Sequence, residues 1–278
     1  NKQGGIEALM RMNYVGSEAL LTAAELDQLD AHLQRHLHLS AASVARWVKD
    51  RFGVHYTESG MTALLHRLGY VYKKPKLIPG KADAEAQKAF LAEYEKLKQT
   101  KGEHDPIYFM DATHPQHNPV LAYGWIKRGE DRAVRSNTGR RRLNINGAID
   151  LERLEPVVRF DDTIDADSTI ALLKQLEEVN LAATWIYVVC DNARYYRSKA
   201  VKAYLKTSRI KLVFLPAYAP NLNLIERFWK FFKKKILYNR YFEGFDEFRE
   251  ACEDFFQNPS QYKPELRSLL TENFPIVG

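Results

Sequence analysis

Cysteine is scarce in this sequence, and long apolar runs are missing. The 278 residues include two cysteines, Cys190 and Cys252, and both lie among apolar neighbours. Two such residues cannot form the disulfide framework of a small secreted domain, so we expect a reducing compartment. No apolar run approaches the ~20 residues that a transmembrane helix needs, and no signal peptide is visible. We therefore expect a cytoplasmic protein.

The sequence also lacks an excess of acidic residues. Its formal net charge is +6 and its pI is about 9.1. Hydrophobic residues make up 45% and charged residues 27%, which is ordinary for a globular protein, and the length allows two domains or one large one. The basic balance indicates an anionic partner, with nucleic acid as the first expectation and a membrane surface as the second.

Residues 23–70 carry the periodicity of three helices. Ser40 and Thr57 are the expected N-caps of the second and third helices, and Gly53 and Gly69 are expected to end them. The short turn between these two helices is typical of a helix-turn-helix, and an ordinary three-helix bundle is the alternative. The side chains that the third helix would present to a DNA groove are Glu58, Ser59, Thr62, His66 and Arg67.

A basic, proline-containing segment follows these helices. Pro75 and Pro79 alternate with lysines and no apolar period is present, so the segment is expected to be extended. It would contact phosphates or the minor groove if the helices bind DNA, and a solvated connector is the alternative. The lysines are Lys73, Lys74, Lys76 and Lys81. Residues 83–101 then predict an amphipathic helix.

From residue 105 the pattern changes to that of an α/β domain. Residues 107–111, 119–129 and 140–150 predict three antiparallel strands, with a turn-rich stretch between the last two. An acidic loop, a helix, the strand 185–190, a helix near 195–206, a strand over 211–216 and a helix over 224–238 follow. A further helix is expected over 245–257. This order predicts a mixed sheet with helices.

Two aspartates occupy equivalent places on two of these strands. Asp111 and Asp191 each end an apolar run, at the edge where ligands bind in α/β sheets. If the strands are neighbours, the two carboxylates repel each other unless a divalent cation such as Mg²⁺ or Mn²⁺ lies between them. A turn or cap aspartate is the alternative for Asp191. Asp150, which also ends a strand, is the main rival to Asp111.

Glu226 is the candidate for a third acid. It follows a proline-flanked approach and precedes a run of lysines. The alternative is a capping glutamate, because Asn223 would cap the helix and place Glu226 at the capping-box position. The basic residues that could contact a phosphate backbone, here and between the predicted strands, are Lys127, Arg128, Arg140, Arg141, Arg142, Lys230, Lys233, Lys234 and Lys235. A solvated basic hairpin is the alternative for the first five.

The strings VVCDNARYYRSKAV and LVFLPAYAPNLNLIERFW resemble the catalytic core of mariner-type superfamily transposases, most closely their bacterial insertion-sequence branch. Thirty-four residues separate Asp191 from Glu226, which is the family's interval between its last two acids. Leu224 stands where the branch often has proline. The other matching residues are Asn192, Ala193, Leu215, Pro216, Tyr218, Pro220, Leu222, Asn223, Ile225 and Trp229.

The resemblance covers residues 105–240 and implies an RNase H-like fold with Asp111, Asp191 and Glu226 as the catalytic, metal-holding triad. It implies two Mg²⁺ ions per site, with Mn²⁺ as a substitute, cleavage of transposon ends and joining of the 3′-OH ends to target DNA, with TA as the expected target. A homodimer that pairs two terminal repeats, located at a bacterial nucleoid, is also expected.

The expected domains are 1–22, the tail of an upstream DNA-binding segment, and 23–72, the helix-turn-helix. They continue with 73–103, the basic linker and helix, and 104–278, the catalytic domain. A catalytically silent, transposase-derived DNA-binding protein is the alternative function, and a stand-alone RNase H-like nuclease is disfavoured by the helix-turn-helix. His32 and His36 lack a third ligand nearby for a zinc site, and His114 and His117 are expected on a surface loop.

Overall fold

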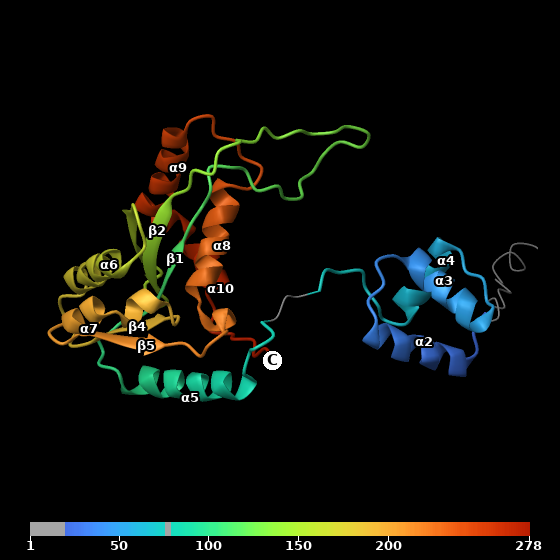
Figure 1. The fold of residues 1–278 in the computed structure, drawn as a ribbon, viewed down its shortest axis with the longest axis horizontal. Coiled ribbons are helices and arrows are strands. Elements are labelled where there is room, and N and C mark those ends of the chain that lie inside the picture. The colour runs from blue at the N-terminus through green and yellow to red at the C-terminus, as the bar shows by residue number, and fades with distance from the viewer. Residues whose placement is uncertain (1–19, 76–78) are drawn as a thin grey trace, which may run out of the picture. The chain divides into compact units, whose positions relative to one another are not determined.

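The computed structural model describes residues 20–75 and 79–278 (Figure 1). The chain divides into two compact units between Lys76 and Leu77. We call the described residues before this division the N-terminal unit and those after it the C-terminal unit. None of the helices in these two ranges has the length and apolar character that crossing a membrane requires.

The N-terminal unit contains the helices α2 (Ala23–Arg35), α3 (Ala41–Phe52) and α4 (Glu58–Arg67). Thr22, Ser40 and Thr57 begin them, each accepting a backbone N–H with its hydroxyl oxygen, as N-caps do. Gly53 ends α3 at φ +71°, a conformation that costs glycine little. The predicted helices and caps are therefore confirmed. Their packed faces bury Leu29, Val44, Val48, Met61 and Leu64.

The C-terminal unit is built on one mixed sheet, in which the described residues form five strands in the order β3-β2-β1-β4-β5. The strands are β1 (Ile107–Thr113), β2 (Asn144–Asp150), β3 (Pro156–Asp161), β4 (Ile186–Cys190) and β5 (Ile210–Phe214). The first three pair antiparallel, and β1, β4 and β5 pair parallel. The predicted mixed sheet is confirmed, and β1 and β4 are neighbours.

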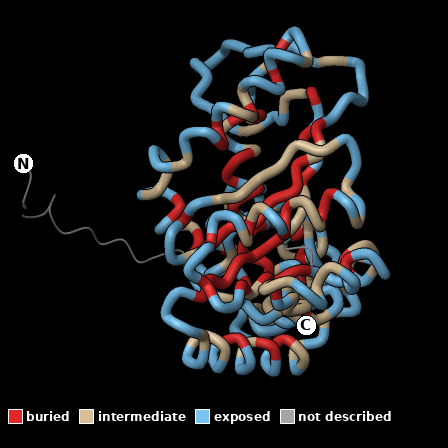
Figure 2. Tube along the Cα trace, turned by 90° about the vertical axis from the view of Figure 1, so that its left-hand side faces the viewer, coloured by how far each residue is buried: buried red, intermediate tan, exposed pale blue. Residues whose placement is uncertain are grey.

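Helices cover both faces of this sheet (Figure 1). They are α5 (Ala84–Thr100), α6 (Ala166–Glu178), α7 (Lys199–Leu205), α8 (Ile225–Ile236), α9 (Phe245–Gln257) and α10 (Lys263–Leu269), with 3-10 turns η1 (Arg194–Arg197), η2 (Pro220–Leu222) and η3 (Pro259–Tyr262). Phe109 points to the face covered by α5, α8 and α9, whereas Tyr108 and Met110 point to the face covered by α6. The buried residues concentrate along the central strands (Figure 2).

One predicted strand is wrong. Residues 119–129 form no strand, and their one ladder contact is an isolated bridge between Val120 and Tyr238. The apolar side chains of this segment have no core to pack against, since Tyr123 and Trp125 are fully exposed. The third antiparallel strand is instead β3, an edge strand whose residues are all half-buried and so show little alternation.

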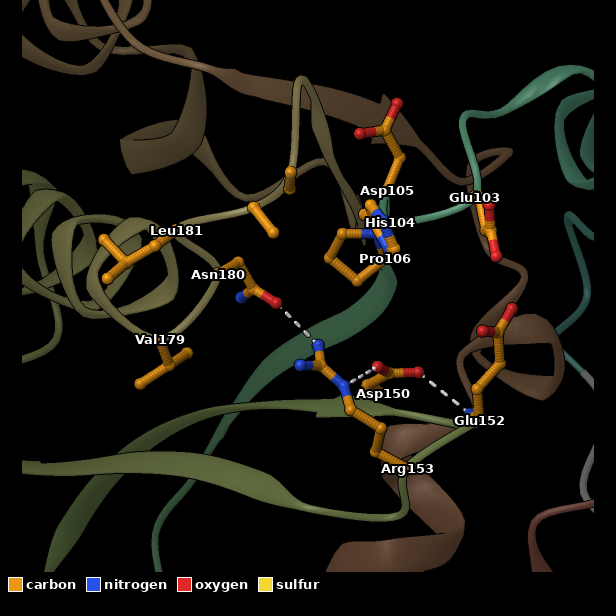
Figure 3. A pocket seen from close by; sticks show the side chains of 12 residues that line it. Glu103, His104, Asp105, Pro106, Asp150, Glu152, Arg153, Val179, Asn180 and Leu181 are labelled. Atoms are coloured by element: carbon orange, nitrogen blue, oxygen red, sulfur yellow. Dashed lines mark hydrogen bonds and ion pairs between the residues drawn. The ribbon is translucent and has the colours of Figure 1, made fainter.

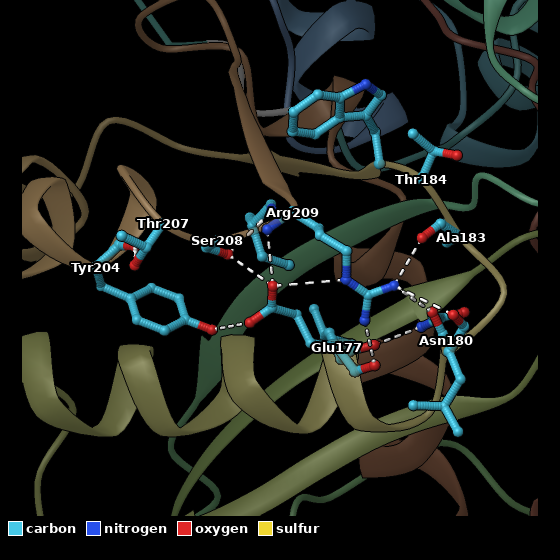
Figure 4. A network of polar contacts seen from close by, with 12 residues as sticks. Glu177, Asn180, Ala183, Thr184, Tyr204, Thr207, Ser208 and Arg209 are labelled. Carbon is cyan, nitrogen blue, oxygen red and sulfur yellow. Dashed lines mark hydrogen bonds and ion pairs between the residues drawn. The ribbon is translucent and has the colours of Figure 1, made fainter.

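A polar network joins the end of α6 to the turn before β5 (Figure 4). The Glu177 carboxylate accepts hydrogen bonds from the Arg209 backbone N–H at 2.8 Å, from the Ser208 hydroxyl at 3.0 Å and from the Tyr204 hydroxyl. The Arg209 guanidinium donates in turn to the carbonyls of Glu177, Asn180 and Ala183 at 2.6–3.0 Å. A cation thereby satisfies carbonyls at a helix C-terminus, where positive charge is favourable.

Arg209→Met is expected to lower the free energy of unfolding by about 1 to 3 kcal/mol, because three carbonyls lose their donor and the Glu177 carboxylate loses an ion-pair partner at 4.0 Å. Urea denaturation followed by circular dichroism measures it. Arg249→Met on α9 is the matched control, since Arg249 pairs with Glu253 on the helix surface and such pairs are worth less than about 1 kcal/mol. Equal effects of the two substitutions would show that the network does not stabilise the fold.

Candidate active site

Asp111 and Asp191 lie at equivalent positions along the neighbouring strands β1 and β4, at the carboxyl end of β4. Phe109 pairs with Val189 across the parallel ladder, so Asp111 on β1 and Asp191, directly after β4, stand at equivalent positions two residues further along. The prediction that β1 ends at Asp111 is wrong by two residues. The strand continues to Thr113 because β2 still pairs with it there, after β4 has ended.

Glu226 reaches the same place from the first turn of α8. The prediction that Asn223 caps this helix is wrong, since α8 begins after Leu224 with no side-chain cap among the described residues. The Asn223 side chain is buried and donates instead to the Met110 carbonyl at 3.2 Å. The capping-box interpretation of Glu226 therefore fails as well. Asn223 ties the start of α8 to β1, one residue before Asp111.

The three acids line one cavity of about 460 Å³. Asp111 is half-buried, while Asp191 and Glu226 are exposed. The remaining wall is the segment between β5 and α8, with Pro216, Tyr218 and Pro220 among its residues. Tyr218 has φ +58°, a conformation that costs a non-glycine residue about 1 kcal/mol or more and often occurs at functional sites.

The electrostatics of the cavity are those of crowded carboxylates. Burial, together with the neighbouring charges of Glu226 and Asp191, raises the pKa of Asp111 to about 7, against the opposing effect of the Ala112 backbone N–H. The site therefore holds more negative charge than it can stabilise alone, which is the condition that a bound cation relieves.

The donor set fits a divalent cation. Carboxylate oxygens from separate elements are the ligands that Mg²⁺ and Mn²⁺ accept. Among the described residues, however, no three carboxylate, imidazole or thiol groups lie close enough together to hold a metal ion as they stand. Glu226 and Asp191 already act on the Asp111 carboxyl, and both are exposed, so rotamer changes of low cost could bring the three acids around one cation.

The loop after Asp191 is held by contacts that sequence reasoning did not identify. The Asp191 carboxylate accepts the Ala193 backbone N–H at 2.9 Å, and the Asn192 side chain donates to the Leu215 carbonyl at 2.7 Å. Arg197 donates to the Asn192 side-chain oxygen at 2.5 Å and stacks over the Phe214 ring. Asn192 thus fixes the end of β4 to the end of β5. The motif match was the signal that could have indicated this role.

The rival aspartate, Asp150, lies toward the opposite end of the strands from Asp111. β2 runs antiparallel to β1, so Asp150 pairs with Tyr108, three residues before Asp111 and toward the other end of β1. It is buried and forms an ion pair with Arg153 at 2.6 Å, in a second cavity of about 360 Å³ (Figure 3). Arg153 also donates to Asn180 at 2.7 Å. Asp150 is therefore a structural acid and no member of the group around Asp111.

The histidines after Asp111 differ from each other. His114 is exposed and hydrogen-bonded to Asn144 at 2.8 Å, as a surface residue should be. The prediction that His117 is also a surface residue is wrong, because its ring is buried against Phe248 and bonds the Phe242 carbonyl at 2.9 Å. His117 anchors the loop between β1 and β2 to the region around α9.

The structure keeps the predicted DNA-contact side chains largely at the surface. Ser59, Thr62, His66 and Arg67 are exposed on α4. Exposed in the same way are Lys73, Lys74, Arg140, Arg141, Arg142, Lys230 and Lys234, while Lys233 is half-buried. Lys76 lies outside the described residues. The contact of these side chains with DNA stays a prediction, and no contact between the two units is implied.

Comparisons with known proteins agree with this architecture. Over 181 residues the chain is 21% identical to the uncharacterized 39 kDa protein of insertion element IS630 from Shigella sonnei, covering 65% of this chain and 52% of that relative. The chain thus matches about half the length of this relative. The crystal structure of the Mos1 strand transfer complex is similar with a TM-score of 0.67 and 15% identity, over 92% of this chain and 76% of that one. The crystal structure of the mariner Mos1 paired-end complex with Mg is similar with a TM-score of 0.65 and 16% identity, over 92% of this chain and 77% of that one.

The fold therefore defines a class of protein in which a helix-turn-helix precedes a domain with an RNase H-like mixed sheet. Residues 37–94 match the family model described as a winged helix-turn helix, and residues 106–249 match the one described as DDE superfamily endonuclease. The chain belongs to the DDE superfamily endonucleases. The resemblance to mariner-type transposases and their insertion-sequence branch, inferred from the motifs, is confirmed.

Proposed function

We propose that this chain is a DNA transposase that binds transposon terminal repeats, cleaves the transposon ends and joins the freed 3′-OH ends to target DNA. The observation that carries the proposal is the convergence of Asp111, Asp191 and Glu226, from two neighbouring strands and one helix, on one cavity. The family assignment and the helix-turn-helix support it, because end recognition requires a DNA-binding element.

In this mechanism Asp111, Asp191 and Glu226 would together hold two divalent cations. Bound Mg²⁺ or Mn²⁺ would supply Lewis acidity at the scissile phosphate and an attacking water of lowered pKa. Asp111 must give up its proton to act, so its raised pKa links activity to pH. Asn192 holds the end of β4, and Asn223 holds the start of α8, beside Asp111.

The partners in the proposal are transposon-end DNA, target DNA and a second copy of the chain. Structures of Mos1 similar to this fold are of a paired-end complex and of a strand transfer complex. By analogy a homodimer would pair two ends, and a TA target is expected. The exposed basic residues on α4, on the loop before β2 and on α8 would contact the phosphate backbone.

Metal-dependent cleavage of the terminal repeat tests this function. Wild type and Asp191→Asn are incubated with a labelled duplex that carries the element's terminal repeat, in Mg²⁺, Mn²⁺ or EDTA, and binding is followed in parallel by mobility shift. Wild type is expected to nick the duplex in either metal, and the variant to lose at least about 10³-fold in rate while binding equally well.

The alternative function predicts a different result from the same experiment. A catalytically silent DNA-binding protein would bind the duplex and leave it intact in both metals. Retention of all three acids around one cavity favours the transposase, because a protein that binds DNA alone has no need of crowded carboxylates beside a phosphate backbone. Binding without cleavage would therefore overturn the proposed chemistry.

A further inference from the structure

The chain segment 271–277 lies against the elements that carry the candidate active site. Arg227, the residue directly after Glu226, donates from Nη1 to the Thr271 carbonyl at 2.7 Å and from Nη2 to the Asn273 carbonyl at 2.6 Å. One guanidinium thus binds two backbone carbonyls of this segment. The rigid fork of arginine suits such paired recognition and fixes the direction of both partners.

A second set of contacts holds the other side of the Glu226 turn. The Asn221 side chain, on η2, donates to the Pro275 carbonyl at 2.8 Å and to the Gln87 side-chain oxygen at 2.9 Å. Gln87 on α5 is fully buried and donates to the Val277 carbonyl at 2.8 Å. A buried amide that is satisfied by a distant backbone segment is costly to disrupt.

The same segment also reaches the strand of Asp111. Phe274 packs edge-on against Tyr94 of α5, with ring centroids 5.8 Å apart, and lies 6.4 Å from the Phe109 ring. Phe109 precedes Asp111 by two residues on β1. Glu272 accepts the Tyr94 hydroxyl at 2.7 Å. Segment 271–277 therefore connects β1, α5 and both sides of Glu226.

We infer that segment 271–277 is a positioning element for Glu226, acting through Arg227 and Asn221. The inference rests on the proposed function, in which Glu226 must meet Asp111 through a bound cation. The start of α8 has no side-chain cap among the described residues, so its first turn depends on other contacts for a fixed place, of which the Asn223 bond to β1 is one. Arg227 and Asn221 supply others on either side of the acid.

The test separates positioning from general stabilisation by measuring metal dependence. Wild type and Arg227→Ala are titrated with Mn²⁺ in two assays, thermal shift without DNA and cleavage of the labelled terminal-repeat duplex. Arg227→Ala is expected to raise the half-saturating Mn²⁺ concentration about tenfold in both assays, with cleavage recovering at high Mn²⁺, as for losses of groups that orient metal ligands. Arg227→Lys, which retains a donor, should recover part of the affinity.

Two controls make the result decisive. Asn221→Ala removes the second contact without touching the helix and should raise the Mn²⁺ requirement in the same direction, which covers the case that Arg227→Ala fails to fold. Arg249→Ala, on the surface of α9, should leave the half-saturating Mn²⁺ concentration unchanged in both assays. If Arg227→Ala and Asn221→Ala lower the melting temperature but leave the half-saturating Mn²⁺ concentration unaltered, the inference is overturned while the proposed transposase function stands. Absence of any metal-dependent cleavage by wild type would remove the proposed function and the inference with it.

Discussion

Asp111→Asn should abolish cleavage and, at the same time, make the metal-free protein more stable at pH 8. The two effects have one cause. Asp111 is crowded by burial and by the charges of Glu226 and Asp191, which raise its pKa to about 7. Above that pH the ionised Asp111 carboxylate repels Glu226 and Asp191 in the metal-free protein. Asparagine removes this charge while keeping the shape of the side chain.

The pH dependence follows from the direction of this shift. The carboxyl of Asp111 ionises near its ordinary value of 3.8 in the unfolded chain but only near 7 in the folded protein. Its contribution to the free energy of unfolding is therefore largest below about pH 4, falls as the pH rises from about 4 to 7, and stays low above that. A shift of this size corresponds to about 4 kcal/mol, so the variant should gain at most that amount at pH 8 and little at pH 4.

Thermal and urea denaturation at pH 4 and pH 8, each with EDTA and with Mg²⁺, measure this prediction. Mg²⁺ should stabilise wild type at pH 8 and have little effect on the variant, because binding to the folded state alone adds stability. Asp150→Asn is the control with the opposite sign, since it breaks the buried ion pair with Arg153 and should destabilise at both pH values. An Asp111→Asn protein that is less stable than wild type at pH 8 without metal would rule out the crowding.

The place of Asp111 and Asp191 could be predicted from the sequence because the signal is local. An apolar strand that runs into a carboxylate shows where the acid lies along the strand, and the parallel pairing of β1 with β4 then brings the two together. Glu226 lies much further along the chain, and the resemblance to a known motif, rather than periodicity, joined it to the other two.

The parts that sequence reasoning missed depend on contacts between distant residues. β3 is a half-buried edge strand, so its alternation is weak. Asn223 has the local signature of a helix cap but bonds the Met110 carbonyl 113 residues away, a partner that only the folded chain supplies. The contacts of segment 271–277 with Gln87 and Arg227 span 44 to 190 residues and leave no periodic trace. Local preference identified the elements, and tertiary contacts decided these side chains.

Gly147→Ala should be among the most damaging single substitutions in the C-terminal unit, although it adds one methyl group. Gly147 is the β2 partner of Asp111 in the antiparallel ladder. A Cβ atom at this position would lie 2.7 Å from Cη2 of Trp229 and 3.0 Å from Cγ1 of Val158, distances at which something must shift. Trp229 is buried on α8, one turn after Glu226, so the indole that must move belongs to the helix that carries the third acid.

The expected result is a loss of about 1 to 3 kcal/mol in the free energy of unfolding, as for other additions to a packed core, together with a larger loss of cleavage than the lost stability explains. Urea denaturation and the cleavage assay, run under conditions where the variant is folded, measure the two effects separately. Gly139→Ala is the control, because a Cβ there would meet nothing within 4 Å among the described residues.

A double-mutant cycle identifies the contact that is responsible. Trp229→Phe removes the part of the indole that the new methyl group would strike, at the cost of a cavity of its own. If the close approach of α8 to the sheet is what glycine permits, Gly147→Ala should cost less in the Trp229→Phe background than in wild type, with a coupling of about 0.5 to 3 kcal/mol. Strictly additive effects would mean that the strain is taken up elsewhere, at Val158 or in the ladder itself. The distance between α8 and the strand of Asp111 would then not be set at this position.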